Sequence, residues 1–310
     1  MTMNLLRNII RLGIGSMFII AAFLKLWSID EFEIYIYSFE IFNFITTTVL
    51  SRLLISGEMI LGSFMIFNVY RRFTCFATLA TECLFTLFLI FVTLFRDDSN
   101  CHCFGDMVEL SPVESMVKNM VTMALLFFIM TKEESKHKAW LPATLCVLSL
   151  VVSFIVTPMD SLYNKIYSSE KEISTIDLHD AFDDIFKIDF TGDDMFVDST
   201  MSLVPDKGKH LMVVVSSGCR YCQLGVRKLS LIMRNKDMDT DKVDVVIWGS
   251  YEGIMSFREM TDTQDYSYWH IMPRQAIDVT YGRFPMFIWM EGDSVVSAGD
   301  FRDIDDSLVL

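Results

Sequence analysis

The stretch LMVVVSSGCRYC, residues 211–222, decides the architecture of the second half of the chain. Its apolar, β-branched run predicts a buried strand, which a short turn then ends. After Cys222 the apolar residues recur at helical spacing, at Leu224, Val226, Leu229, Ile232 and Met233. The order strand, turn, helix places Cys219 at the helix N-terminus, where the helix dipole and free amides stabilise a thiolate. Cys222 lies one turn further on, in position to resolve a mixed disulfide.

Two later segments extend this pattern. VDVVIWG, residues 243–249, predicts the next strand, and RFPMFIWMEGDSVVSAG, residues 283–299, predicts a proline followed by two strands around a Gly-Asp turn. With the preceding strand, C-x-x-C and helix, this order resembles the thioredoxin fold over about residues 183–302. The resemblance implies a cis Phe284–Pro285 bond that faces the cysteines, with Pro285 shaping a substrate groove. A proline at the start of a strand is also typical of an edge strand.

The chain departs from the thioredoxin pattern at its end. Only DFRDIDDSLVL, residues 300–310, follows the last predicted strand. This segment is short for the usual final helix, so we expect one face of the sheet to be covered differently. Alternative uses of Cys219 and Cys222 are a static disulfide or half of a zinc site. A zinc ribbon needs a second C-x-x-C or a histidine pair, so redox chemistry is favoured.

Composition divides the 310 residues into two halves. The chain is 52% hydrophobic, which is high for a soluble protein. Residues 1–158 carry 11 basic and 13 acidic residues, whereas residues 159–310 carry 15 and 27. The acidic composition of the second half therefore predicts a soluble domain. So much negative charge argues against a nucleic-acid partner, because there is no excess of basic side chains to neutralise phosphates.

The first half contains apolar runs long enough to cross a membrane, which takes about 20 residues each. Five candidates occur, at roughly 6–27, 44–68, 73–95, 113–130 and 139–158. The first could instead be a signal peptide, but it is long and no small-x-small cleavage site follows it. We therefore predict a polytopic α-helical membrane bundle of four helices plus a fifth linking helix, followed by a soluble α/β domain.

Charges between the spans predict their orientation, because basic loops stay in the cytoplasm. The basic positions are Arg7, Arg11, Arg71, Arg72, Lys132, Lys136 and Lys138. The alternate loops, IDEFE at 29–33 and RDDSNCHCFGD at 96–106, are acidic. This pattern predicts a multi-pass protein of the bacterial inner membrane with a cytoplasmic N-terminus and a periplasmic C-terminal domain. Both cysteine pairs then face a compartment that permits disulfides.

The loop CHCFGD, residues 101–106, holds the second cysteine pair. A disulfide between Cys101 and Cys103 closes a very small ring, and strained disulfides are labile and oxidising. Gly105 permits an unusual turn beside the pair. His102 could carry a proton or bias a thiolate, and it could equally be an ordinary loop residue.

At this loop the sequence resembles the MauE branch of the DoxX-like membrane proteins, whose signature is a C-x-C-F-G loop. Here the signature reads Cys101-His102-Cys103-Phe104-Gly105 and is followed by Lys118-Asn119. FLKLW at 23–27 and GEMILG at 57–62 also fit the family. MauE proteins are implicated in the disulfide-dependent maturation of an exported amine dehydrogenase. The resemblance thus implies a role in the maturation of exported proteins.

The whole layout resembles the bacterial vitamin K epoxide reductase fusions, in which a thioredoxin-like domain exchanges disulfides with a helical bundle and the bundle reduces a quinone. That family uses C-x-x-C in the bundle, whereas this chain has C-x-C. We predict a MauE/DoxX-like domain at 1–135, a fifth helix and tether at 136–175, and a thioredoxin-like domain at 176–310. The flexible segment at 159–175 would reach about 20–25 Å.

Charged residues lie within the predicted spans, where they are costly and are functional candidates. Glu58 and Glu82 are expected either to bind a quinone head group and its protons or to form buried ion pairs. Arg52 and Lys25 are the basic residues within the spans, and the expected ion pair joins Arg52 to an acid on another span. The apolar-run cysteines are expected to pack in the core, as buried cysteine does; they are Cys75, Cys83 and Cys146.

These patterns predict a thiol–disulfide oxidoreductase with Cys219, Cys222, Cys101, Cys103 and Pro285 as its catalytic residues. Its expected carriers are redox-active disulfides and a quinone, its partners are exported thiol-containing client proteins, and no metal is expected. Two alternatives stay open. One is a non-catalytic maturation factor of the MauE type. The other is a metal-handling protein that uses Cys101, His102 and Cys103, because thiolates and imidazole suit copper or zinc.

Overall fold

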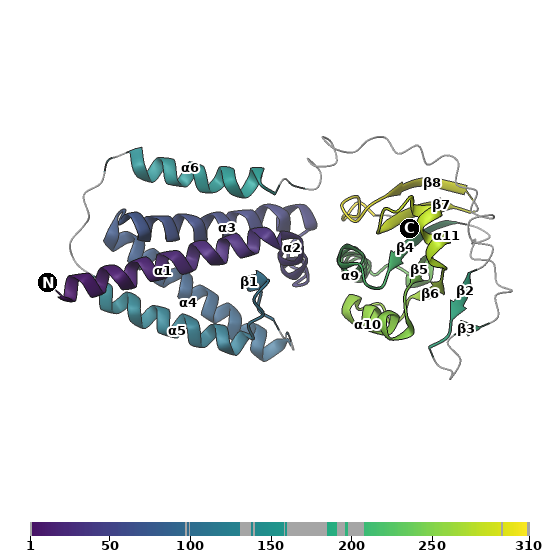
Figure 1. Ribbon diagram of the computed structural model, residues 1–310, viewed down its shortest axis with the longest axis horizontal. Helices are drawn as coiled ribbons and strands as arrows, with labels where there is room; N and C mark the ends of the chain where they lie inside the picture. The colour runs from purple at the N-terminus through teal and green to yellow at the C-terminus, as the bar shows by residue number, and fades with distance from the viewer. Residues whose placement is uncertain are drawn as a thin grey trace. The chain divides into compact units, whose positions relative to one another are not determined.

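The computed structural model describes residues 2–96, 98, 100–130, 138, 140–157, 159, 185–190, 196–197, 208–292 and 294–308. The chain forms two compact units, Met1–Met159 and Asp160–Leu310 (Figure 1). The predicted boundaries at 135 and 175, and the tether from residue 160 to 175, lie outside the described residues. Those boundaries and the reach of the tether stay predictions.

The first unit is built from long apolar helices. Four are long and apolar enough to cross a membrane, namely α1 (Thr2–Trp27), α3 (Phe44–Phe67), α4 (Arg71–Phe95) and α5 (Pro112–Ile129). The fifth, α6 (Trp140–Ile155), is apolar but has only 16 residues. At 1.5 Å per residue it is about 24 Å long. Four of the five predicted spans are therefore present as helices long enough to cross a membrane. The fifth crossing stays a prediction.

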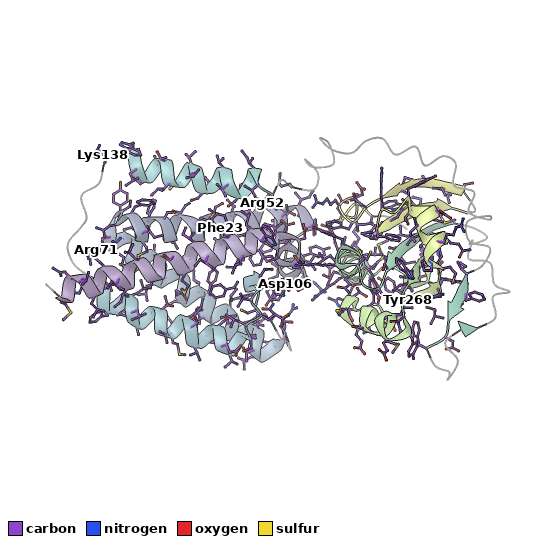
Figure 2. The ribbon with its side chains drawn as sticks, viewed as in Figure 1. Phe23, Arg52, Arg71, Asp106, Lys138 and Tyr268 are labelled. Carbon is purple, nitrogen blue, oxygen red and sulfur yellow. The ribbon has the colours of Figure 1, made fainter. Side chains whose placement is uncertain are left out.

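The long helices pack closely on one another and expose apolar side chains outward. Glycines allow the tightest approach, between α1 and α3: a Cβ atom on Gly62 would lie 2.8 Å from the carbonyl oxygen of Gly15. Small residues at such crossings are typical of membrane helices. Phe23 of α1, labelled in Figure 2, is 54% exposed, as a lipid-facing side chain would be.

A short helix that the sequence analysis did not predict, α2 (Ile29–Tyr37), follows α1. We expected an acidic loop at 29–33. Asp30 and Glu31 instead lie in the first turn of the helix. Their negative charges stabilise the helix there by interacting with the positive end of its dipole. Glu33 turns inward and forms a buried ion pair with Arg52 of α3. The acids thus belong to the first turns of a helix, which Glu33 anchors to α3, rather than to an irregular loop.

The second unit contains one sheet of seven described strands, in the order β3-β2-β6-β5-β4-β7-β8. These strands are β2 (Phe186–Ile188), β3 (Phe196–Val197), β4 (Lys209–Ser216), β5 (Val243–Trp248), β6 (Ser267–His270), β7 (Met286–Glu291) and β8 (Ser294–Gly299). β4 pairs in parallel with β5 and antiparallel with β7. The predicted strands at 211–216, 243–248 and 286–299 are therefore confirmed, and β4 lies inside the sheet.

Helices cover both faces of this sheet. Figure 1 shows α9 (Arg220–Asn235) and α10 (Tyr251–Thr261) on one face and α11 (Pro273–Thr280) on the other. Residues Ala276 and Val279 of α11 pack with Met212, Val214 and Ile288. α11 therefore covers the face of the sheet opposite α9.

After β8 the described part of the C-terminal segment, residues 300–308, forms turns and no helix. Phe301 packs against α9, where a Cβ atom on Gly225 would lie 2.8 Å from the Phe301 Cβ atom. The buried ammonium of Lys228 donates a hydrogen bond to the Phe301 carbonyl oxygen at 3.2 Å. These contacts hold the segment along α9 without a final helix.

Candidate redox site

The first cysteine pair lies where β4 ends and α9 begins. Cys219 is the N-cap residue of α9, and its sulfur accepts a hydrogen bond from the backbone amide of Cys222 at 3.3 Å. Cys219 is partly exposed, whereas Cys222 is fully buried. The predicted arrangement is thus present, with one accessible thiol and one protected thiol on the same helical turn.

The two thiols of this pair differ in acidity. A hydrogen bond from the Cys222 thiol, helped by the backbone amides of residues 221 and 222, lowers the pKa of Cys219 to about 6. Burial, followed by the hydrogen bond to Cys219, raises the pKa of Cys222. Cys219 is therefore a thiolate at neutral pH and the better nucleophile, because the thiolate is the reactive form.

Pro285 lies at the same edge of the sheet. The Phe284–Pro285 bond is cis, as the thioredoxin resemblance implied. β7 begins at the next residue and Met286 pairs with Val214 of β4. A Cβ atom on Gly225 would lie 3.2 Å from Pro285 Cγ, so the proline ring packs against the start of α9.

Aromatic side chains surround this edge. Tyr221 is 51% exposed and stacks on Phe301, with ring centroids 5.5 Å apart. Trp248, at the end of β5, lies 6.4 Å from the Phe284 ring. These rings lie at the end of the sheet where β4 leads to Cys219 and where Pro285 precedes β7.

The second cysteine pair lies between α4 and α5, at the start of β1 (Cys103–Asp106). The sulfur of Cys101 accepts a hydrogen bond from the Cys103 amide at 3.3 Å and lies 2.9 Å from the Ser115 hydroxyl. Gly105 has a φ of 67° and fits closely against the end of α1, where a Cβ atom would lie 2.7 Å from the Leu24 carbonyl oxygen. The expected unusual turn at Gly105 is therefore present, and it docks the loop on the bundle.

The loop thiols also differ in acidity. A hydrogen bond from the Cys103 thiol lowers the pKa of Cys101 to about 6, and the Ser115 hydroxyl and the charge of Lys118 act in the same direction. The hydrogen bond to Cys101, together with burial, raises the pKa of Cys103. Each cysteine pair thus combines one acidic thiol with one that holds its proton.

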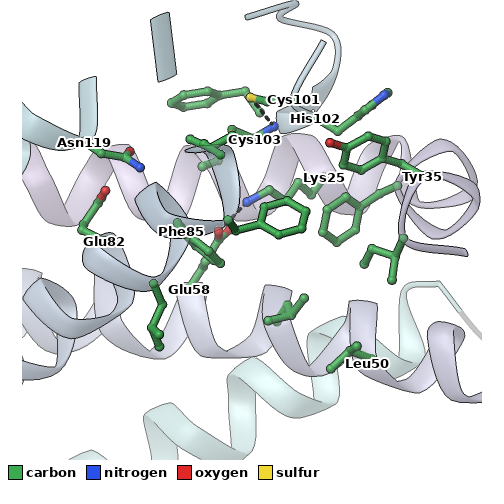
Figure 3. Close-up of a pocket in the computed structure, with 18 of the residues that line it drawn as sticks. Lys25, Tyr35, Leu50, Glu58, Glu82, Phe85, Cys101, His102, Cys103 and Asn119 are labelled. Atoms are coloured by element: carbon green, nitrogen blue, oxygen red, sulfur yellow. Dashed lines mark hydrogen bonds and ion pairs between the residues drawn. The ribbon is translucent and has the colours of Figure 1, made fainter. Parts of the chain in front are cut away.

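A cavity of about 320 Å³ opens beside the loop cysteines (Figure 3). Cys101, His102 and Cys103 line it, together with residues of α1 to α5, and seven of the lining residues are phenylalanines. The His102 ring lies against Tyr35 of α2, with centroids 4.5 Å apart. The size is at the lower end of the range for ligand sites, about 300–1,000 Å³. The cavity suits one compact apolar ring system.

Polar side chains enter this apolar cavity from the helices. Lys25 and Glu58 form a buried ion pair between α1 and α3 (Figure 3). Glu82 of α4 and Asn119 of α5 also line the cavity, and each is 1% exposed. The two predicted carboxylates thus reach one cavity with Cys101 and Cys103. Lys25 and Arg52 both form ion pairs, but the partner of Arg52 is Glu33 on α2 and not an acid on a span.

The sequence analysis missed the cavity itself, and with it Tyr35, Phe85 and Asn119 as site residues. In the sequence, Asn119 stands out only as part of the Lys118-Asn119 pair that follows the C-x-C-F-G signature. Of the three cysteines expected in the core, Cys75 is buried, Cys146 is half-buried and Cys83 is exposed on the bundle surface. In the described part of the chain, no three His, Cys, Asp or Glu side chains are placed to share a metal ion.

Fold and site together define a class: a membrane helical bundle joined to a soluble α/β domain of thioredoxin-like fold. Residues 3–132 match the family model described as Methylamine utilisation protein MauE. The predicted MauE resemblance is confirmed for these residues. Membership of a wider DoxX-like group and the likeness to the epoxide reductase fusions stay predictions.

Two known proteins are similar to parts of the chain. Protein TlpB of Flavobacterium psychrophilum is 27% identical over 181 residues, which is 54% of this chain and 49% of that protein. The chain thus spans about half the length of this relative. A crystal structure of a secreted Mycobacterium tuberculosis disulfide oxidoreductase aligns at 12% identity with a TM-score of 0.26, covering 31% of this chain and 71% of that one. The fold assignment rests on the strand order and the position of the C-x-x-C and the cis proline.

Proposed function

We propose that the protein is a membrane thiol–disulfide oxidoreductase that relays two electrons between Cys219/Cys222, Cys101/Cys103 and a diffusible quinone. One observation carries this proposal: the chain holds two close cysteine pairs, one at the N-terminus of a helix beside a cis proline and the other at a cavity between the long apolar helices. In each pair the first thiol has a lowered pKa and the second a raised one, which agrees with this role.

Exchange between the pairs is ordinary thiol–disulfide chemistry. The Cys219 thiolate attacks one sulfur of a Cys101–Cys103 disulfide, a mixed disulfide forms and the other loop sulfur leaves as a thiolate. Cys222 then loses its proton and displaces the loop sulfur from Cys219. The loop pair ends reduced and the Cys219–Cys222 pair ends oxidised. The reverse sequence uses the same residues.

The cavity supports a quinone as the second redox partner of the loop. A quinone supplies an acceptor for two electrons and two protons. The phenylalanine-rich lining suits its ring, and Glu58 and Glu82 would exchange protons with the ring oxygens. Cys101 and Cys103 line the same cavity, so the ring would lie beside the thiols with which it reacts.

For the setting, we propose the bacterial inner membrane with the N-terminus in the cytoplasm and the C-terminal domain in the periplasm. The alternating basic and acidic loops support this orientation. The partners are then exported client proteins whose thiols meet Cys219 at the edge formed by Tyr221, Trp248 and Pro285.

The relay is tested by trapping. A Cys222→Ala variant cannot resolve a mixed disulfide at Cys219, so membranes that contain it should accumulate a link between the Cys219 peptide and the loop peptide. Proteolysis and mass spectrometry detect this link, and replacing both Cys101 and Cys103 by Ser should remove it. If Cys219 is trapped only on other proteins, or on nothing, the relay between the two pairs is wrong.

The MauE match favours a second candidate, a maturation factor that holds client thiols without turnover. Such a factor would still bind its client after both loop cysteines are replaced. The relay instead requires those cysteines for every cycle of client oxidation or reduction.

A further inference from the structure

Four buried oxygen atoms at the cavity lack hydrogen-bond partners among the residues that the structure describes. They are Oε2 of Glu82, Oε2 of Glu58, Oδ1 of Asn119 and the hydroxyl oxygen of Tyr35. These residues are 1%, 5%, 1% and 5% exposed. Buried polar atoms are nearly always hydrogen-bonded, so a set of unsatisfied acceptors around one cavity points to a ligand that donates.

The orientation of the Asn119 amide follows from its neighbour. The Thr86 hydroxyl donates its proton to the backbone carbonyl oxygen of Glu82, at 2.7 Å. Its oxygen can then only accept, and it accepts from Nδ2 of Asn119 at 3.2 Å. The amide nitrogen therefore faces Thr86 and leaves Oδ1 as the unsatisfied atom. Figure 3 shows Asn119 and Glu82 together at one end of the cavity.

We infer that this cavity binds the hydroquinol form of its ring more tightly than the quinone form. The inference rests on the proposed quinone site. Both oxygens of a quinone only accept hydrogen bonds, whereas both hydroxyls of a hydroquinol donate. Glu58 and Glu82 can serve either form, because a carboxyl group accepts when ionised and donates when protonated. The Tyr35 hydroxyl can also serve either form, because it both donates and accepts. Oδ1 of Asn119 only accepts, so Asn119 is the residue that discriminates.

This preference favours one direction of electron flow. A site that binds the reduced form more tightly shifts the equilibrium toward reduction of the ring. In the balanced step, Cys101 and Cys103 lose two electrons and form an S–S bond. The Cys103 thiol releases one proton and the solvent supplies the second, because the Cys101 thiolate carries none. The ring gains two electrons and two protons, and its two C=O groups become C–OH groups. The loop disulfide then oxidises Cys219/Cys222, and the protein supplies disulfides to its clients.

Binding measurements test this inference without turnover. The full chain carries Cys101→Ser and Cys103→Ser, which prevent it from reducing the ligand, and is held in nanodiscs without oxygen. Calorimetry measures the Kd values of a short-tailed naphthoquinone and of its hydroquinol. We expect the hydroquinol to bind about tenfold more tightly, as one added hydrogen bond in a buried site would give.

Two variants assign the preference to the amide. Asn119→Leu should weaken hydroquinol binding and bring the two Kd values together. Thr86→Val removes the group that fixes the amide, although residue 86 does not line the cavity, and should also reduce the preference. This second variant decides the question if Asn119→Leu fails to fold.

The outcomes separate the inference from the proposed function. Equal Kd values, or a preference that survives both variants, overturn the hydroquinol inference and leave the quinone site standing. Binding of neither form overturns the quinone site as well. Tighter binding of the quinone form reverses the direction of electron flow assigned to the relay.

Discussion

At the scale of single residues, each reactive thiol depends on its partner cysteine. The hydrogen bond from the second thiol is the largest cause of the lowered pKa in both Cys101 and Cys219. The partner therefore activates the nucleophile in the reduced state and also closes the disulfide in the oxidised state. Replacing a partner changes both properties, and the two effects are separable by measurement.

We expect the rate of Cys219 alkylation by iodoacetamide to rise with pH through a midpoint near 6, because the thiolate dominates above its pKa. Cys222→Ala should move this midpoint upward, toward the value of an ordinary thiol, roughly 8.5. Cys222→Ser keeps a hydroxyl donor and should move it less. Mass spectrometry of the Cys219 peptide from the full chain measures the rate. A midpoint that stays near 6 in Cys222→Ala would show that the partner thiol is not the cause.

The buried ion pair between Arg52 and Glu33 gives a second residue-scale prediction. Arg52→Leu leaves the Glu33 carboxylate buried without this guanidinium and should cost about 3–5 kcal/mol of stability. The double variant with Glu33→Leu should recover most of the loss, because no unpaired charge then remains. Thermal unfolding in detergent compares the variants. Equal losses in the single and double variants would contradict a paired role.

At the scale of elements, helix contacts shape the cavity. Gly15 and Gly62 bring α1 close to α3, and Lys25 of α1 then meets Glu58 of α3 at the cavity wall. The loop cysteines reach the same wall because Gly105 docks their turn against α1. Spacing between these helices therefore controls both the ion pair and the position of the loop.

Two glycines of α3 offer a matched test of this spacing. Gly62→Ala places a Cβ atom 2.8 Å from the Gly15 carbonyl oxygen and should destabilise the bundle by about 1–3 kcal/mol. Gly57→Ala meets nothing within 4 Å and should be neutral or stabilise by about 0.5–1 kcal/mol, because alanine favours the helix. Thermal unfolding in detergent measures both. Similar effects of the two changes would argue against a tight crossing at Gly62.

At the scale of the whole molecule, the proposed relay needs both cysteine pairs on one side of the membrane. α1, α3, α4 and α5 are long enough to cross it. Four crossings alone would return the chain to the side of its N-terminus, so the location of the second unit depends on α6. Orientation is therefore the property of the whole chain on which the proposed function depends most.

Labelling in spheroplasts tests this orientation. In a cysteine-free background, Val296→Cys on β8 should react with a membrane-impermeant maleimide before lysis. Tyr70→Cys, between α3 and α4, should react only after lysis. Both native side chains are exposed, at 64% and 44%, so access within the fold is comparable. Labelling of both positions only after lysis would place the second unit in the cytoplasm and exclude the proposed periplasmic clients.

Local patterns in the sequence were enough to predict the spans, the strand before Cys219, the helix after Cys222 and the hairpin after Pro285. These features depend on the hydrophobicity and period of neighbouring residues, which a sequence displays directly. Helix α2 escaped prediction because its nine residues are too few to establish a period and begin with acids that also suit a loop.

Only the tertiary structure decided the cavity and the partners within it. Lys25, Glu58, Glu82 and Asn119 come from α1, α3, α4 and α5, and they meet because these helices pack on one another around the cavity. The sequence marked Glu58 and Glu82 as costly charges, but not which would be paired. Glu58 has Lys25 beside it, whereas Glu82 lies near Asn119, and that difference arises from contacts between residues far apart in the chain.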